Sequence, residues 1–164
     1  MPTAGTGYRG RVAEPEDLVA SEPLLADPVA LGMIAHPEGG WYRETWRHQR
    51  QVDTPRGPRA LATSVSFLLL PGERSAWHRV ASDELWLWQG GGPARLILGR
   101  DGDRPDPQPP VLLATGGQQL VPAGVWQSAE PATDRAVLVG CVVSPGFDFA
   151  DFTLADFTLD DPEG

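Results

Sequence analysis

Residues 63–99 read TSVSFLLLPGERSAWHRVASDELWLWQGGGPARLILG, and this stretch decides the fold. Short apolar or alternating runs are separated in it by turn residues such as Pro71-Gly72. Runs of about four to eight residues bounded by Gly and Pro are typical of β-strands. The stretch therefore predicts four consecutive strands, at Thr63–Leu70, Ser75–Val80, Glu84–Gln89 and Arg95–Gly99.

The rest of the chain continues this pattern on both sides. Further strands are predicted over Gly40–His48, Val111–Thr115, Gln118–Val121 and Arg135–Ser144. The polar segments 49–60 and 100–110 contain several prolines and are predicted to be loops. Many short strands without a long helix among them predict an all-β jelly roll or barrel, because closing the sheets removes exposed strand edges.

The N-terminal part has a different character. Glu14-Pro15 and Asp27-Pro28 each place Pro where a helix commonly begins, which predicts a short helical N-terminal arm. Residues 1–14 are polar and Gly-rich and are expected to be disordered. Since the amino-acid composition does not change again further along the chain, we expect residues 15–160 to form a single domain.

Charge and composition exclude several classes of partner. The 164 residues include 13 basic residues, all Arg, and 22 acidic ones, for a net charge of −9. This balance argues against nucleic acid and against an anionic membrane surface as partners. No segment approaches the roughly 20 apolar residues of a membrane helix, the N-terminus does not resemble a signal peptide, and the single cysteine, Cys141, cannot form an internal disulfide. We therefore expect a cytoplasmic protein.

His78 and Glu84 are the first candidates for chemistry. Strand alternation places His78 on one face of Ser75–Val80, and Glu84 begins the next strand. An imidazole and a carboxylate that converge inside a barrel can move a proton or ligate a metal. The structural alternative is a histidine of the barrel wall with an exposed glutamate.

A second element is Gly116-x5-Pro122-x-Gly124-x2-Gln127, which by itself predicts an ordinary hairpin. Together with Gly72-x5-His78 and Glu84, it resembles the two motifs of the cupin superfamily. In metal-binding cupins those motifs supply three histidines and a glutamate. The resemblance implies that His78 and Glu84 stand at two of these positions, while Val80 and Gln127 replace the other two histidines. A weak site for a divalent transition metal at His78, Glu84 and Gln127 is therefore possible, although we expect no cofactor.

The stretch His36–Glu44, HPEGGWYRE, resembles the signature of one small cupin family of largely unknown function, sometimes labelled predicted sugar epimerases. The agreement continues through three later motifs and spans roughly residues 30–155. The resemblance implies a jelly-roll barrel, usually as a homodimer.

Other side chains are predicted to surround a small-molecule ligand. Tyr42 is a candidate proton donor at the barrel mouth, and Glu44 shares its face of the strand. Trp86 and Trp88 share the face of Glu84, where they either form a flat wall for a ring or pack in the core. The complete predicted ligand-binding set is His36, Arg43, Glu44, Trp86, Trp88, Trp126 and Gln127.

Three functions fit these observations. The first is a metal-free acid/base isomerase or epimerase acting on a sugar-like or small carbonyl substrate, with His78 as base, Glu84 setting its tautomer or raising its pKa, and Tyr42 as acid. The second is a non-catalytic small-molecule binding protein. The third is a weakly metal-dependent lyase or oxygenase that uses His78, Glu84 and Gln127.

Overall fold

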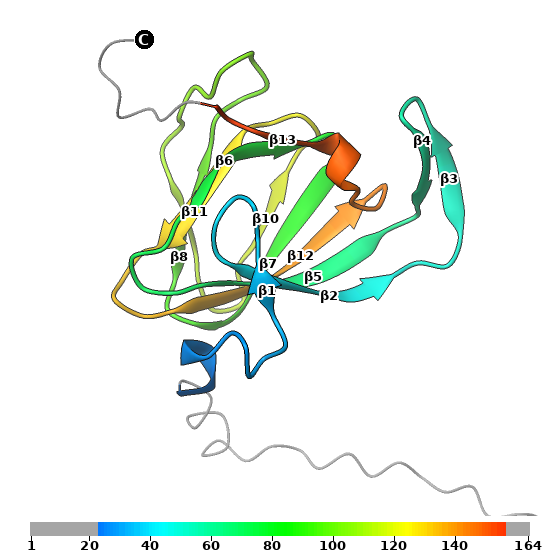
Figure 1. The fold of residues 1–164 in the computed structure, drawn as a ribbon. Coiled ribbons are helices and arrows are strands. Elements are labelled where there is room, and N and C mark those ends of the chain that lie inside the picture. The colour runs from blue at the N-terminus through cyan, green and yellow to red at the C-terminus, as the bar shows by residue number, and fades with distance from the viewer. Residues whose placement is uncertain (1–22, 157–164) are drawn as a thin grey trace, which may run out of the picture.

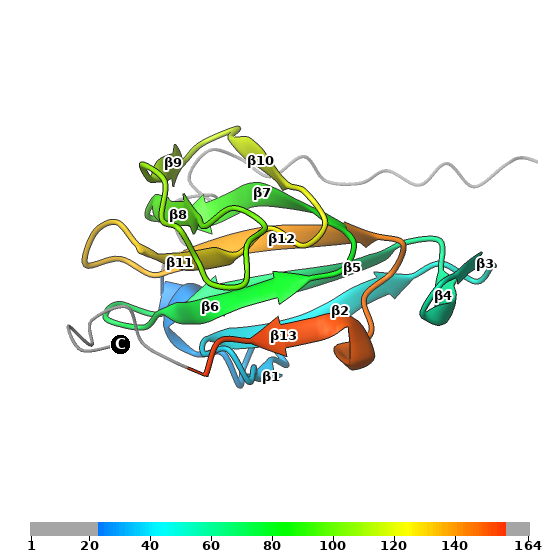
Figure 2. The same ribbon diagram turned by 90° about the horizontal axis from the view of Figure 1, so that it is seen from above.

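The computed structural model describes residues 23–156, which form two facing β-sheets with a hairpin beyond one end (Figures 1 and 2). The elements follow one another as η1 (Pro23–Ala26), β1 (Ile34–Ala35), β2 (Trp41–Arg47), β3 (Gln51–Thr54), β4 (Gly57–Ala60), β5 (Thr63–Leu69), β6 (Ser75–Val80), β7 (Asp83–Gly91), β8 (Ala94–Leu98), β9 (Val111–Leu113), β10 (Gln118–Val121), β11 (Gln127–Pro131), β12 (Val137–Ser144), η2 (Phe149–Asp151) and β13 (Phe152–Leu154). The helices η1 and η2 are single 3₁₀ turns.

The two sheets have the strand orders β1-β2-β5-β12-β7-β10 and β13-β6-β11-β8-β9. Every strand pair in the described residues is antiparallel. The main core lies between the sheets and includes the almost fully buried side chains of Phe67, Trp86, Leu96 and Val139. This arrangement confirms the predicted all-β jelly roll, and it leaves an inner space toward which alternate residues of both sheets point.

All eight predicted strands are present, but the prediction of a loop at residues 49–60 is wrong. This segment forms the β3–β4 hairpin, in which Val52 pairs with Arg59. The hairpin projects away from the barrel (Figure 1). Since most of the hairpin has no face against the core, its sequence lacks the alternation of apolar and polar residues that reveals a half-buried strand.

The helix predicted after Asp27 is replaced by a capped turn. The Asp27 carboxylate accepts a hydrogen bond from the backbone N–H of Ala30 at 3.0 Å, and the N–H of Met33 bonds the carbonyl of Pro28. The helix expected at Glu14-Pro15 and the disorder expected at residues 1–14 lie outside the described residues. Between residues 23 and 156, no helix is long and apolar enough to cross a membrane.

Residues 147–152, here called the strap, connect the two sheets near the C-terminal end of the described chain. They follow β12 of the six-stranded sheet and lead into β13, which pairs with β6 of the other sheet. The buried Asp151 accepts hydrogen bonds from Arg59 at 2.8 and 2.9 Å and from Arg56 at 2.9 Å. These bonds pull the pKa of Asp151 below its ordinary value, chiefly through Arg59. The projecting hairpin thus holds the strap in place.

Candidate functional site

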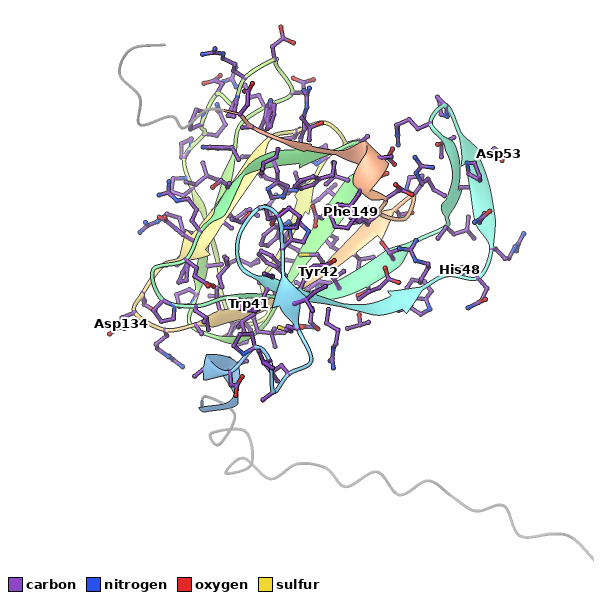
Figure 3. The ribbon with its side chains drawn as sticks, viewed as in Figure 1. Trp41, Tyr42, His48, Asp53, Asp134 and Phe149 are labelled. Atoms are coloured by element: carbon purple, nitrogen blue, oxygen red, sulfur yellow. The ribbon has the colours of Figure 1, made fainter. Side chains whose placement is uncertain are left out.

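A cavity of about 340 Å³ lies between the sheets beneath the strap. Its walls come from β2, β5, β6, β7 and β12, and the strap contributes Phe147, Phe149 and Phe152. In Figure 3, Tyr42 and Phe149 lie at this part of the barrel, whereas Asp53 lies far from it on the β3–β4 hairpin. The cavity is therefore the place where both sheets and the strap can contact one ligand.

A glycine turn carries two polar side chains into this cavity. Gly39 and Gly40 both have positive φ, and the Cβ of any other residue at Gly39 would collide with the carbonyl of Arg74. The turn is tied to β6 by a 2.7 Å hydrogen bond from the N–H of Ala76 to the carbonyl of Glu38. The glycines are therefore required for His36 and Glu38 to face the interior.

Glu38 and His78 form the centre of the site. Oε2 of Glu38 lies 3.2 Å from Nε2 of His78, and Oε1 of Glu38 accepts a 2.9 Å hydrogen bond from the hydroxyl of Ser75. Nδ1 of His78 lies 2.8 Å from the carbonyl oxygen of Ala76. A carbonyl only accepts, so Nδ1 carries a proton and donates it, which leaves Nε2 of the neutral ring as an acceptor facing Glu38.

Burial sets the charge of this pair. It raises the pKa of Glu38 to about 8, and it lowers the pKa of His78 despite the neighbouring Glu84 carboxylate. At neutral pH both groups are therefore uncharged, and the Glu38 carboxyl donates its proton to Nε2 of His78. A separated carboxylate and imidazolium would each lose hydration here, so we assign a neutral hydrogen bond rather than an ion pair.

His36 is a second neutral imidazole beside the same carboxyl. Its Nδ1 accepts from the backbone N–H of Glu38 at 3.3 Å and lies 3.4 Å from Oε2 of that residue. Burial and the nearby His78 lower the pKa of His36 to about 4. Aromatic rings surround it, with Tyr42 edge-on at a centroid distance of 4.7 Å and Phe149 stacked at 5.9 Å. One carboxyl proton thus faces acceptor nitrogens on two rings.

Glu84 lies in the cavity wall but is engaged elsewhere. Its Oε2 accepts from the amide of Gln127 at 2.6 Å, and the amide oxygen of Gln127 accepts from the indole N–H of Trp86 at 2.9 Å. Burial raises the pKa of Glu84. Of the two roles predicted for Glu84, the carbonyl of Ala76 rather than Glu84 fixes the tautomer of His78, whereas the negative charge of Glu84 does act to raise the pKa of His78 against the larger effect of burial.

A β-bulge decides which residues of β2 reach the cavity mouth. The register against β5 shifts between Glu44 and Trp46, so the alternation predicted for this strand breaks at Thr45. Glu44 and Arg47 both line the mouth, joined by hydrogen bonds of 2.7 and 3.1 Å, whereas Trp46 is 48% exposed. The mouth therefore carries a paired cation and anion.

Comparison with known proteins identifies the family. Residues 29–155 match the sequence profile described as Cupin superfamily (DUF985). The chain is a member of this cupin family. No protein among those with curated descriptions matches it significantly.

Solved structures show the same relationship. Protein SO0799 from Shewanella oneidensis is 35% identical, with a TM-score of 0.66 over 76% of this chain and 79% of that one. A hypothetical protein from Leishmania major is 32% identical, with the same TM-score over 76% of this chain and 82% of that one. The cupin-2 domain Rru_A2000 from Rhodospirillum rubrum is only 14% identical, with a TM-score of 0.56 over 75% of this chain and 74% of that one, and it shares the fold. The epimerase activity, the homodimer and the cytoplasmic location stay predictions.

The donor set of this cupin does not fit the metal site that the superfamily motif suggests. Val80 offers no donor atom, and the side-chain oxygen of Gln127 already accepts from Trp86. Within residues 23–156, no three His, Cys, Asp or Glu side chains are grouped so that they can hold an ion.

The predicted site residues separate into two groups. The cavity is lined by His36, Tyr42, Glu44, His78, Glu84 and Trp86, and Gln127 is buried directly behind Glu84 and Trp86. Arg43, Trp88 and Trp126 do not line it. The indole N–H of Trp88 donates to the carbonyl of Gly92 in the adjoining turn, that of Trp126 donates to the carbonyl of Gly102 in the 100–110 loop, and Arg43 lies exposed beside Gly32.

Several cavity residues were missed from the sequence. Glu38 stands inside the same His36–Glu44 signature that drew attention to His36, yet nothing in a Pro-Glu-Gly turn announces that the carboxyl is buried. The strap, with its aromatic residues, also escaped the sequence-based prediction. Its spacing Phe147-x-Phe149-x2-Phe152 was the available signal, because three aromatic residues in a polar segment require a surface to cover.

Proposed function

We propose that this cupin is a metal-independent acid/base isomerase that moves a proton at the carbon next to a carbonyl group of a small substrate. The observation that carries the proposal is the neutral pair of Glu38 and His78 in the cavity wall, with 3.2 Å between Oε2 and Nε2. One member holds a transferable proton, and the other holds a basic lone pair that becomes available when this proton passes to the substrate. General acid and general base are thus present side by side at neutral pH.

The proposed step balances within this pair. The O–H bond of Glu38 breaks and its proton bonds to the carbonyl oxygen of the substrate. Nε2 of His78 takes the proton from the adjacent carbon, and the C–H electrons become the C=C bond of an enol. The pair is then a carboxylate and an imidazolium at hydrogen-bond distance, which stabilises both charges. Return of the protons to another carbon or another face gives the isomer, with Tyr42 as a further candidate donor.

Replacing the carboxyl tests the proposal directly. Small ketones are incubated with the protein in deuterated water, and loss of the α-proton signal is followed by NMR. We expect exchange with the native protein and a loss of about 100-fold or more in Glu38→Gln, the size typical of removing a general acid. Glu130→Gln is the matched control, because Glu130 is also hydrogen-bonded but pairs with Arg74 and Arg95 on the outer surface. Ketone binding without exchange would contradict catalysis and favour a binding protein.

A further inference from the structure

The cavity walls are aromatic and aliphatic, and they limit the ligand by shape. Phe147, Phe149 and Phe152 of the strap meet edge-to-face, with ring centroids 5.0 to 6.2 Å apart. Phe67 and Trp86 meet in the same way on the sheet side. Such walls bury a flat apolar body well. An apolar cavity of about 150 Å³ is enough for a benzene ring, so 340 Å³ holds a substituted or fused ring rather than a nucleotide sugar.

The charged side chains around the cavity disfavour the binding of anionic ligands. Among residues 23–156, Arg47 is the one cationic side chain in the lining, and Glu44 already occupies it with two hydrogen bonds. The other ionisable groups on the lining from β6, β7 and the strap are His78, Glu84 and Asp148, with His36 and Glu38 from the glycine turn. None of these offers a free cation to a carboxylate or phosphate. Because burying an unpaired anion is expensive, such ligands are disfavoured.

The polar groups of the interior leave few hydrogen bonds for a ligand. Gln127 is bonded to Trp86 and Glu84, Ser75 to Glu38, and Nδ1 of His78 to Ala76. A free sugar has a hydroxyl on nearly every carbon, and each hydroxyl would lose water here without regaining a partner. The pair of Glu38 and His78, together with the hydroxyl of Tyr42 on the lining, can satisfy one carbonyl but not the hydroxyls of a whole sugar ring.

We propose that the cavity selects uncharged, ring-sized apolar carbonyl compounds and rejects anionic ligands and free sugars of similar size. This inference rests on the proposed function for the reacting group, but it concerns binding and has its own test. It replaces the expectation of a sugar-like substrate.

The test compares four probes at neutral pH by calorimetry and by quenching of tryptophan fluorescence, since Trp86 lines the cavity. The probes are 1-indanone, indane-1-carboxylate, D-glucose and UDP-glucose. We expect 1-indanone to bind at least tenfold more tightly than each of the others. Equal or tighter binding of the carboxylate, the sugar or the nucleotide sugar overturns the inference, and so does failure of all four to bind.

A matched pair of variants places the binding in the cavity. Val143 of β12 lines it, whereas the next residue back, Val142, alternates to the other face of the strand. We expect Val143→Phe to weaken 1-indanone binding at least tenfold and Val142→Phe to leave it within twofold. Equal effects would contradict the assignment. Because Val143→Phe can also disturb packing, protection of Cys141 serves as a second measurement.

Cys141 is the single cysteine of the chain and lies on the cavity wall. Burial raises the pKa of its thiol, so its alkylation in the native protein is slow, and the rate of that slow reaction reports occupancy of the cavity. We expect saturating 1-indanone to slow alkylation of the native protein at least fivefold, and unchanged alkylation would overturn the inference. The two proposals can fail separately. Binding of 1-indanone without α-proton exchange leaves the ligand class standing and removes catalysis. Exchange on a carboxylate-bearing ketone, with no binding of 1-indanone, removes the ligand class and leaves the acid/base chemistry.

Discussion

Oε2 of Glu38 and Nε2 of His78 lie 3.2 Å apart, with both side chains almost completely buried. The distance fits a hydrogen bond, and the donor is the carboxyl, because the other ring nitrogen of His78 already donates to Ala76. A carboxylic acid kept neutral at pH 7 by its surroundings is a means by which enzymes hold a proton ready for transfer.

Stability should fall as pH rises from 6.5 to 8. The folded chain keeps the proton of Glu38 up to about pH 8, whereas the unfolded chain loses it near 4.5, so in this window the unfolded chain binds fewer protons. His36 acts in the opposite direction, but only between about pH 4 and 6.5. The raised pKa of Glu84 gives a stability effect of the same sign as that of Glu38, and the lowered pKa of His78 one of the same sign as that of His36.

Denaturant titrations at several pH values check this expectation. The free energy of unfolding should decrease by at most about 1.4 kcal/mol per pH unit for each such group. Glu38→Gln should flatten the slope of the unfolding free energy against pH between 6.5 and 8, while Glu130→Gln should preserve it. The pKa of Glu130 is lowered, so this carboxyl is already ionised throughout that range. A slope in Glu38→Gln equal to the native one would show that Glu38 is not protonated in this range.

The rate of α-proton exchange should also depend on pH. Because the lowered pKa of His78 keeps its ring neutral, the base is available throughout the neutral range. The acid is lost as Glu38 ionises near pH 8. Initial rates measured by NMR should therefore be level near pH 7 and fall tenfold per pH unit well above 8. A rate that climbs steadily from pH 7 to 9 would mean that an ionised carboxylate, not the acid, is the active form.

Asp151→Asn should loosen the strap. The carboxylate accepts three hydrogen bonds from Arg56 and Arg59, and an amide can accept with one oxygen only. We expect the free energy of unfolding to drop by about 2 kcal/mol, which is typical of losing a charge-assisted hydrogen bond. Binding of 1-indanone should weaken too, because Phe149 and Phe152 flank Asp151. Asp106→Asn is the control, since its partner Arg100 lies on the surface. Native ligand affinity in Asp151→Asn would contradict the role given to the strap.

The native protein should not retain a transition metal in stoichiometric amount. Tag-free protein is incubated with excess zinc or manganese, desalted and analysed by mass spectrometry of the elements. We expect well below one ion per chain, because Gln127 and Val80 replace imidazoles and the Gln127 oxygen is occupied. One tightly held ion per chain that is lost in Glu84→Ala would instead support the metal-dependent alternative.

The strands and the cupin motifs were predictable from the sequence because each depends on local pattern. The alternation of side chains along Ser75–Val80 correctly predicted that His78 faces the interior, and Pro and Gly residues marked the turns. The features that were missed depend on tertiary placement. The bulge at Thr45 redirects Arg47 to the cavity mouth without any signal in the residues, and Glu38 becomes a neutral acid only because the folded turn buries it.

The most direct test of the central claim is the ionisation of Glu38 itself. Carbon-13 NMR of the glutamate carboxyls, with Glu38→Gln used to assign the signal, follows this group between pH 4 and 10. We predict that Glu38 titrates near pH 8 and that the nitrogen-15 shifts of His78 show a neutral ring protonated at Nδ1. A Glu38 signal that titrates near 4.5 beside a doubly protonated His78 would contradict the neutral pair and the mechanism built on it.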